Sequence, residues 1–204
     1  MSSVCPYRNI CRRASCPPNI RDCGLFSFLK ATNQQKQTFR NKRDLQLISD
    51  LERNYVHAWN RHATSAGKGS AMGCCFEEWI RKILKRNGIP SQKGFVGFRF
   101  GKFQVDAAIP SCKSPCTILE IKMRVDIQSA LMIRGLFDQL TNPDTKIGLV
   151  TFYDYTPKRQ IMNIFSSWKR RFQKRFDCFH IENGWSTEIA RIVNFCLCLS
   201  SSAN

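Results

Sequence analysis

No stretch of this chain approaches the roughly 20 consecutive apolar residues that a membrane-spanning helix needs. Residues 1–13 also contain no apolar segment of the kind found in secretory signal peptides. Both absences argue against a membrane protein and against a secreted one. We therefore expect a soluble protein of the cytoplasm that has no membrane partner.

Acidic residues are few: 15 Asp and Glu stand against 32 Lys and Arg, which gives a formal net charge of +17. An excess of positive charge this large favours a polyanionic partner such as nucleic acid, with an anionic membrane surface as the alternative. The length of 204 residues allows one domain with a core of ordinary size plus a terminal extension. We expect residues 1–70 to form a cysteine-containing arm with a helix, and residues 71–204 to form the main domain.

The 11 cysteines include no Cys-x2-Cys pair of the kind that common zinc modules use. The first four, Cys5, Cys11, Cys16 and Cys23, are separated by five, four and six residues, so a structural zinc site there is the less favoured alternative. An odd count also argues against a disulfide framework. We expect most of the cysteines to be reduced.

The N-terminal extension contains one clear helical pattern. Residues 1–35 include three prolines and four cysteines without an apolar period, which predicts an irregular arm. Apolar residues then recur at helical spacing over residues 43–59. Residues 65–73 are mostly small, which predicts a flexible loop that brings Lys68 close to a nucleic-acid backbone.

The main domain begins with a helix that includes residues 76–84 and ends at Asn87-Gly88. Three predicted strands follow, over residues 95–100, 103–109 and 117–123, with a tight turn at Gly101-Lys102 between the first two.

The rest of the domain alternates between helix and strand. A helix capped by Asp126 runs to about residue 140, and residues 146–152 are almost all apolar, as in a strand buried on both faces of a parallel sheet. A helix starting at Thr156-Pro157, a short strand over residues 176–181 and a helix over residues 186–197 complete the chain. This order predicts an α/β fold with a mixed central β-sheet flanked by helices.

Three charged residues interrupt the apolar strands of this sheet. Asp106 lies on one predicted strand, and Glu120 and Lys122 lie on the next. Because side chains alternate along a strand, Glu120 and Lys122 share one face. Burying such groups is costly unless they pair or bind a metal, so the trio predicts a functional site. The simpler alternative is a turn-bonded Asp106 and a structural pair of Glu120 with Lys122.

The trio suits a divalent metal and a phosphate. Magnesium prefers oxygen ligands and keeps several waters, so Asp106, Glu120 and the main-chain carbonyl of Ile121 are sufficient ligands. Such a metal assists phosphodiester hydrolysis, and Lys122 can orient the attacking water, help to deprotonate it, or hold the scissile phosphate.

The spacing of these residues resembles a known signature. Asp106, then 13 residues, then Glu120-Ile121-Lys122 resembles the motif of the PD-(D/E)xK nuclease superfamily, with Val105 where relatives often have proline. The resemblance covers roughly residues 70–197. It implies a restriction-endonuclease-like core with a helical or irregular N-terminal extension, and dependence on magnesium, for which manganese can substitute.

Relatives often carry a further acid on a helix before the core strands. Glu77 resembles that position best, and Glu78 is the second choice. The resemblance therefore implies that Glu77 joins Asp106, Glu120 and Lys122 as a catalytic residue, and joins Asp106, Glu120 and Ile121 as a metal ligand.

The charged and polar residues around the trio carry one alternative and one further resemblance. Glu77 and Glu78 lie four residues before Arg81 and Lys82, so each can instead form a surface ion pair along the helix. Gln139 resembles a polar residue that the family often has on the helix after Glu-x-Lys.

A basic cluster near the C-terminal end predicts contacts with the DNA backbone, with a solvated helix face as the alternative. Its members are Lys169, Arg170, Arg171, Lys174 and Arg175. The three histidines are isolated, and we assign none of them a catalytic role.

The most specific expectation is a type II restriction endonuclease, which hydrolyses both strands of double-stranded DNA at a defined sequence. The resemblance implies a homodimer, because a twofold protein matches a twofold DNA site. The alternatives are a homing, recombination-junction or repair nuclease of the same fold, and a non-catalytic DNA-binding protein.

Overall fold

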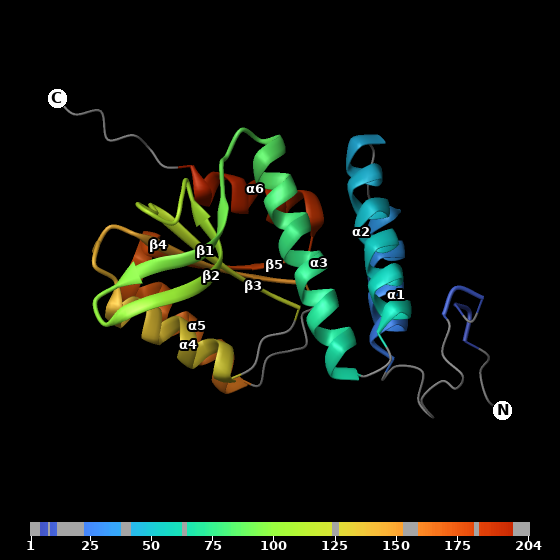
Figure 1. The fold of residues 1–204 in the computed structure, drawn as a ribbon, viewed down its shortest axis with the longest axis horizontal. Helices are drawn as coiled ribbons and strands as arrows, with labels where there is room; N and C mark the ends of the chain where they lie inside the picture. Colours follow the sequence, from blue (N-terminus) through green and yellow to red (C-terminus); the bar gives the residue numbers. More distant parts are fainter. Residues whose placement is uncertain are drawn as a thin grey trace. The chain divides into compact units, whose positions relative to one another are not determined.

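The computed structural model describes residues 5–7, 9–11, 23–37, 42–62, 65–123, 127–152, 159–181 and 184–197 (Figure 1). Contacts divide the chain into two units, Met1–Phe76 and Glu77–Asn204. The boundary lies inside helix α3 (Ser65–Arg86), and the division expected after residue 70 falls in the same helix. No helix in these ranges combines the length and the apolar character needed to cross a membrane.

The first unit contains α1 (Gly24–Lys36), α2 (Lys42–Arg61) and the beginning of α3. α2 confirms the predicted helix, but α1 corrects the prediction of an irregular arm up to residue 35. The helical signal of α1 is short: Leu25, Phe28 and Leu29 are buried at i, i+3 and i+4. Phe28 stacks on Tyr55 of α2 with a ring-centroid distance of 3.6 Å, so packing against α2 stabilises a helix whose own pattern is weak.

Residues 65–73 belong to α3, so the prediction of a flexible loop is wrong. Lys68 is only 6% exposed, and its ammonium lies 4.9 Å from the ring centroid of Trp59. A cation held on an indole ring in this way is stabilised by the fold and is poorly placed to contact phosphate. The proposal that Lys68 reaches DNA from a loop therefore loses its structural basis.

The second unit is built on a five-stranded mixed sheet in the order β1-β2-β3-β4-β5. The strands are β1 (Gln92–Phe98), β2 (Gly101–Ile109), β3 (Thr117–Lys122), β4 (Lys146–Thr151) and β5 (Phe176–His180). β1, β2 and β3 pair antiparallel, whereas β3, β4 and β5 pair parallel. The predicted α/β class and mixed sheet are confirmed.

Three helices and a short 3-10 helix alternate with the strands from β3 onward. They are α4 (Ile127–Gln139), α5 (Arg159–Phe172), η2 (Gln173–Arg175) and α6 (Trp185–Cys196). The predicted helix starts at Asp126 and at Thr156-Pro157 lie outside the described residues. Gly88 has φ +73° at the end of α3, a backbone conformation that favours glycine, as expected for the predicted helix end.

The turn between β1 and β2 lies two residues earlier than predicted. Phe98 pairs with Gly101, so Arg99 and Phe100 form the turn, and Gly101-Lys102 opens β2. Gly101 has φ +145°, so the glycine serves the entry into the strand rather than the turn itself.

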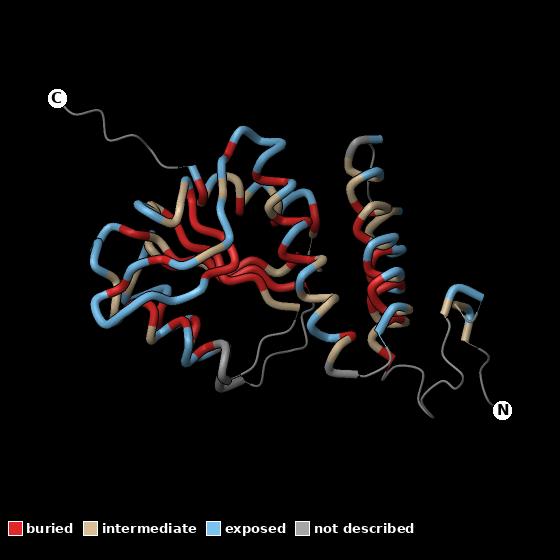
Figure 2. The backbone as a smooth tube through the Cα atoms, in the orientation of Figure 1, coloured by how far each residue is buried: buried red, intermediate tan, exposed pale blue. Residues whose placement is uncertain are grey.

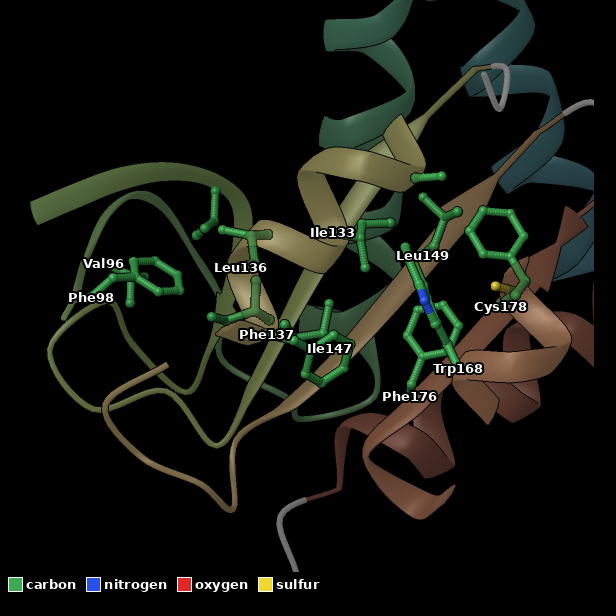
Figure 3. Close-up of a cluster of buried hydrophobic side chains, with 14 of the residues drawn as sticks. Val96, Phe98, Ile133, Leu136, Phe137, Ile147, Leu149, Trp168, Phe176 and Cys178 are labelled. Carbon is green, nitrogen blue, oxygen red and sulfur yellow. The ribbon is translucent and has the colours of Figure 1, made fainter. Parts of the chain in front are cut away.

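Helices cover both faces of the sheet, and the buried residues concentrate on its strands (Figures 1 and 2). On one face, Ile147 and Leu149 of β4 pack with Ile133 of α4 and Trp168 of α5 (Figure 3). On the other face, α6 packs on β4 at Gly148, and the Trp79 ring of α3 lies edge-on to the Trp185 ring of α6, with centroids 4.7 Å apart. Parallel strands covered on both sides explain why the predicted β4 segment is almost entirely apolar.

Gly148 is predicted to tolerate no larger residue. A Cβ at this position would lie 2.7 Å from Leu119 Cδ2 and 3.0 Å from Phe195 Cε1, so Gly148→Ala should lower the free energy of unfolding by about 1–3 kcal/mol. Urea denaturation measures this. Gly135→Ala in α4 is the control: its Cβ would meet nothing within 4 Å, and a gain of up to about 1 kcal/mol is expected. Equal stability of Gly148→Ala and the unmodified protein would contradict the close packing of Gly148 against Leu119 and Phe195.

Candidate active site

Asp106, Glu120 and Lys122 come together where β2 meets β3. Lys122 Nζ lies 3.0 Å from Asp106 Oδ2 and 3.1 Å from Glu120 Oε2. Asp106 and Glu120 are 9% and 2% exposed, whereas the Lys122 side chain is 31% exposed. The structure thus brings the three predicted residues into one group in which two buried carboxylates share a partly accessible ammonium. Their catalytic role stays a prediction.

An irregularity in β2 falls at Asp106. Gln92 of β1 pairs with Ala108, and Gly94 pairs with Val105. Between these two pairs β1 has one residue and β2 has two, so the extra residue of a β-bulge falls at Asp106 and the residue after it. Bulges change the direction of a side chain relative to the regular alternation and are frequent beside functional sites.

The regular pairing of β2 with β3 ends beside the same aspartate. The last regular pair joins Ala107 to Leu119, and beyond it the N–H of Ile121 donates a 2.8 Å hydrogen bond to Asp106 Oδ2. A side-chain oxygen therefore takes the place of a main-chain partner at this point. The carboxylate is fixed from two directions, by the Ile121 N–H and by the Lys122 ammonium.

The surroundings of the trio shift the pKa values of both Glu120 and Lys122. Burial, together with the neighbouring Asp106 carboxylate, raises the pKa of Glu120 to about 7, although the Lys122 ammonium acts in the opposite direction. For Lys122, burial lowers the pKa, but the two carboxylates more than offset this and the net change is upward. Lys122 is therefore an ammonium at neutral pH, which suits it to hold a phosphate oxygen better than to accept a proton.

Glu77 lies in a second layer of charges around Asp106. Its Oε2 pairs with Lys93 Nζ and lies 3.9 Å from Arg81 Nη1. Arg81 in turn donates a 3.1 Å hydrogen bond to the main-chain carbonyl of Asp106. The alternative pairing of Glu77 with Arg81 is thus present, and so is that of Glu78 with Lys82, in which Nζ lies 3.0 Å from Oε1 at the surface.

Within the described ranges, no group of three or more His, Cys, Asp or Glu residues lies close enough to hold a metal ion. Glu77 is therefore not brought into one ligand set with Asp106 and Glu120, and its role as a metal ligand stays a prediction. Cys5, Cys11 and Cys23 are free thiols and form no such group among the described residues. Cys16, the fourth member of the suggested zinc site, lies outside the described residues.

The cysteines of the described ranges are mostly reduced, as expected. Eight carry thiols, and Cys116 is disulfide-bonded. Burial raises the pKa of Cys178 and of Cys196 to about 12, so these thiols are protonated and behave as small apolar side chains.

The basic cluster divides into structural and exposed members. Lys169 forms an ion pair with Asp177, and Arg175 donates a hydrogen bond to the Thr145 carbonyl and lies over the Phe137 ring. Arg170, Arg171 and Lys174 are exposed. Lys169 is exposed as well, so four of the five cluster members are presented to solvent, and Lys169 and Arg175 also stabilise the fold.

Two features beside the trio were not predicted. Arg81 contacts the main chain of Asp106, and Lys93 pairs with Glu77, but the sequence pattern indicated a role only for Arg81, as an alternative partner of Glu77. Lys122 also pairs in register with Thr151, whose Oγ1 lies 2.6 Å from His180 Nδ1, so a polar row crosses the ends of β3, β4 and β5. Strand order decides the second grouping, and the packing of α3 beside β1 and β2 decides the first; no spacing in the sequence signals either.

Gln139 is the last residue of α4. Its main-chain carbonyl accepts a 2.9 Å hydrogen bond from the N–H of Arg99 in the β1–β2 turn. The suggested match of Gln139 to a family position stays a prediction.

Comparison of the chain with protein-family models, with curated proteins and with solved structures found no match. The resemblance to PD-(D/E)xK nucleases therefore depends on the residues and geometry of the chain itself.

We predict that Glu120→Gln changes the pH dependence of stability. Between the ordinary value of 4.5 and about pH 7 the folded protein holds a proton on Glu120 that the unfolded chain has released, so stability falls as pH rises through this window. Glu120→Gln removes this loss. Relative to the unmodified protein, it should gain about 3 kcal/mol of unfolding free energy between pH 4.5 and pH 8.

Urea denaturation in the presence of a chelator measures the effect at several pH values. Glu78→Gln is the matched control, because Glu78 forms an exposed ion pair whose loss should change stability by less than about 0.5 kcal/mol. A difference between Glu120→Gln and the unmodified protein that stays constant with pH would contradict a proton held on Glu120.

Proposed function

We propose that this chain is a metal-dependent endonuclease that hydrolyses phosphodiester bonds of double-stranded DNA. The observation that carries the proposal is the trio itself: two carboxylates, almost fully buried on adjacent strands, share one partly accessible ammonium. The trio has an excess of one negative charge when all three groups are ionised, inside a chain of net charge +17. A local excess of negative charge of this kind attracts a cation.

The donor groups fit magnesium, with manganese as a substitute. Asp106 and Glu120 offer hard oxygen ligands, and the carbonyl of Ile121 is the third proposed ligand. The raised pKa of Glu120 indicates that Lys122 alone does not keep this carboxylate ionised at neutral pH, so a further cation would stabilise the charged form. Magnesium retains several waters, which makes few protein ligands sufficient. When bound, it supplies the activation of a water and stabilises charge on the reacting phosphate.

The protein groups then have separate roles. The Lys122 ammonium, which is the most accessible of the three, holds a non-bridging oxygen of the scissile phosphate. Asp106 keeps Lys122 and the end of β3 in place through its Oδ2 atom. Arg81 fixes the main chain of Asp106, and Glu77 together with Lys93 fixes Arg81, so these three are positioning residues.

The exposed part of the basic cluster supplies affinity for the DNA backbone. Arg170, Arg171 and Lys174 lie close together at the end of α5 and in η2, and phosphate contacts of this type do not depend on base sequence.

The narrower form of the proposal is a type II restriction enzyme that acts in the cytoplasm as a homodimer on a palindromic site. A junction or repair nuclease with the same core is the second candidate. It is favoured by the exposed aromatic residues of the β1–β2 hairpin, Phe95 and Phe100.

We predict that Asp106→Ala and Glu120→Gln abolish DNA cleavage. Each removes a proposed metal ligand and a partner of Lys122, so the cleavage rate should fall by about 100-fold or more. Plasmid DNA incubated with magnesium or manganese and resolved by electrophoresis measures the rate, and a chelator should abolish it. Mapping of the fragment ends distinguishes a defined recognition sequence from a structure-selective cut.

The matched pair Glu77→Gln and Glu78→Gln separates positioning from surface charge. Glu77→Gln should reduce cleavage about 10-fold, because Arg81 and Lys93 lose their common partner, whereas Glu78→Gln should leave it unchanged. DNA binding without cleavage of duplex, single-stranded and branched substrates in either metal would refute the enzymatic proposal and leave a DNA-binding protein.

A triple substitution, Arg170→Ala with Arg171→Ala and Lys174→Ala, is predicted to weaken binding to all duplex sequences alike. Each lost phosphate contact should reduce the slope of log affinity against log salt concentration by about 0.9. Fluorescence anisotropy with a chelator present measures the slope. Arg134→Ala is the control, because Arg134 is an exposed arginine of α4 in the same unit. An unchanged slope in the triple variant would exclude this cluster from the DNA surface.

A further inference from the structure

The β1–β2 hairpin presents aromatic rings to solvent. Phe95 is 62% exposed, Phe100 in the turn is 75% exposed, and Phe103 is 40% exposed. These are the exposed phenylalanines of the described ranges, and all of them fall within this one hairpin. Phe103 pairs with the buried Val96 and so lies on the opposite face of the hairpin from Phe95. Phenylalanine is usually buried, so the two most exposed rings, Phe95 and Phe100, indicate a binding surface.

The hairpin is positively charged, which favours a negatively charged partner. From residue 92 to residue 105 the sequence contains Lys93, Arg99 and Lys102 and no acidic residue. The Arg99 guanidinium lies 5.3 Å from the Phe100 ring centroid, so a cation and an aromatic ring form one exposed unit at the turn. A partner must offer both negative charge and flat apolar groups.

Gly97 leaves space beside the rings. It shares a strand face with Phe95, since the two residues are two positions apart, and it pairs across the hairpin with Lys102. A Cβ at Gly97 would meet nothing within 4 Å. A flat group can therefore lie against this part of the hairpin next to a lysine.

We propose that the β1–β2 hairpin binds unpaired bases of DNA, which stack on Phe95 and Phe100 while Arg99 and Lys102 contact the adjacent phosphates. Every base has a flat face that can stack on an aromatic ring, and cations that follow the backbone complete such sites without a need for sequence recognition.

The choice of DNA over other anionic partners rests on the proposed function. β2 continues from the hairpin turn to Asp106, and the six residues from Gly101 to Asp106 span roughly 20 Å. A single strand held on the hairpin is thus led along β2 to the trio. The substrate class that follows is DNA with single-stranded or locally opened segments, such as branched or damaged duplexes.

Binding of fluorescein-labelled oligothymidine and of a labelled blunt duplex, measured by anisotropy with a chelator present, tests the inference without any cleavage step. Phe95→Ala combined with Phe100→Ala should weaken binding of oligothymidine about 10-fold or more, and binding of the duplex by less than about twofold. Phe100→Trp should retain the affinity of the unmodified protein. Leu131→Ala, which truncates a residue of α4 that is 59% exposed, is the matched control and should change neither affinity.

The outcomes separate this inference from the proposed function. Loss of oligothymidine binding in the double alanine variant supports the hairpin site, whether or not the protein cleaves DNA. If no combination of metal and substrate gives cleavage, only the enzymatic proposal fails. Oligothymidine binding by the double variant within twofold of the unmodified protein overturns the inference, whatever the cleavage results. If the double alanine variant loses binding to phosphatidylserine vesicles but keeps oligothymidine binding, the inference is overturned as well. The hairpin is then assigned to a membrane surface.

Discussion

The buried carboxylates of Asp106 and Glu120 lie side by side because the ammonium of Lys122 pairs with both. Charges removed from water lose several kcal/mol of hydration each, and only close opposite charges and hydrogen bonds compensate for that loss. Lys122 provides both to Asp106 and to Glu120. The compensation is incomplete, as the pKa of about 7 at Glu120 indicates, so the site has residual affinity for a proton or for another cation. The chemistry proposed for the chain follows from this imbalance.

The sheet determines that the three groups meet. β3 is antiparallel to β2 and parallel to β4, so it is the strand at which the two halves of the mixed sheet join. Asp106 lies on β2 in the antiparallel half, whereas Glu120 and Lys122 lie at the end of β3, which pairs with the parallel half. Helices on both faces keep water away from the carboxylates and leave the longer lysine side chain as the accessible member.

The parts of this arrangement that depend on local pattern could be predicted from the sequence. Alternation along a strand placed Glu120 and Lys122 on one face, and the apolar run of residues 146–152 predicted a strand buried on both sides. The parts that depend on packing between distant segments could not be predicted. Lys68 lies in a helix with its charge on the Trp59 ring, and Glu77 is paired with Lys93, which is 16 residues away in the sequence.

Register is a further property that the sequence did not reveal. The extra residue at Asp106 becomes visible only when β1 and β2 are paired, because an unpaired strand shows no bulge. The hairpin turn at Arg99 and Phe100 was missed for a related reason: glycine at residue 101 indicates an unusual backbone conformation, but pairing decides which residues form the turn.

The bulge also gives the chain a short evolutionary route away from its proposed activity. Deletion of a single residue beside Asp106 would equalise the lengths of β1 and β2 between their flanking pairs, so the hairpin would close as a regular ladder. The apolar contacts of the sheet would persist, whereas the carboxylate would lose its position against the Ile121 N–H. A chain with this deletion would keep the basic surface and the exposed aromatic hairpin while losing the arrangement on which the proposed cleavage depends.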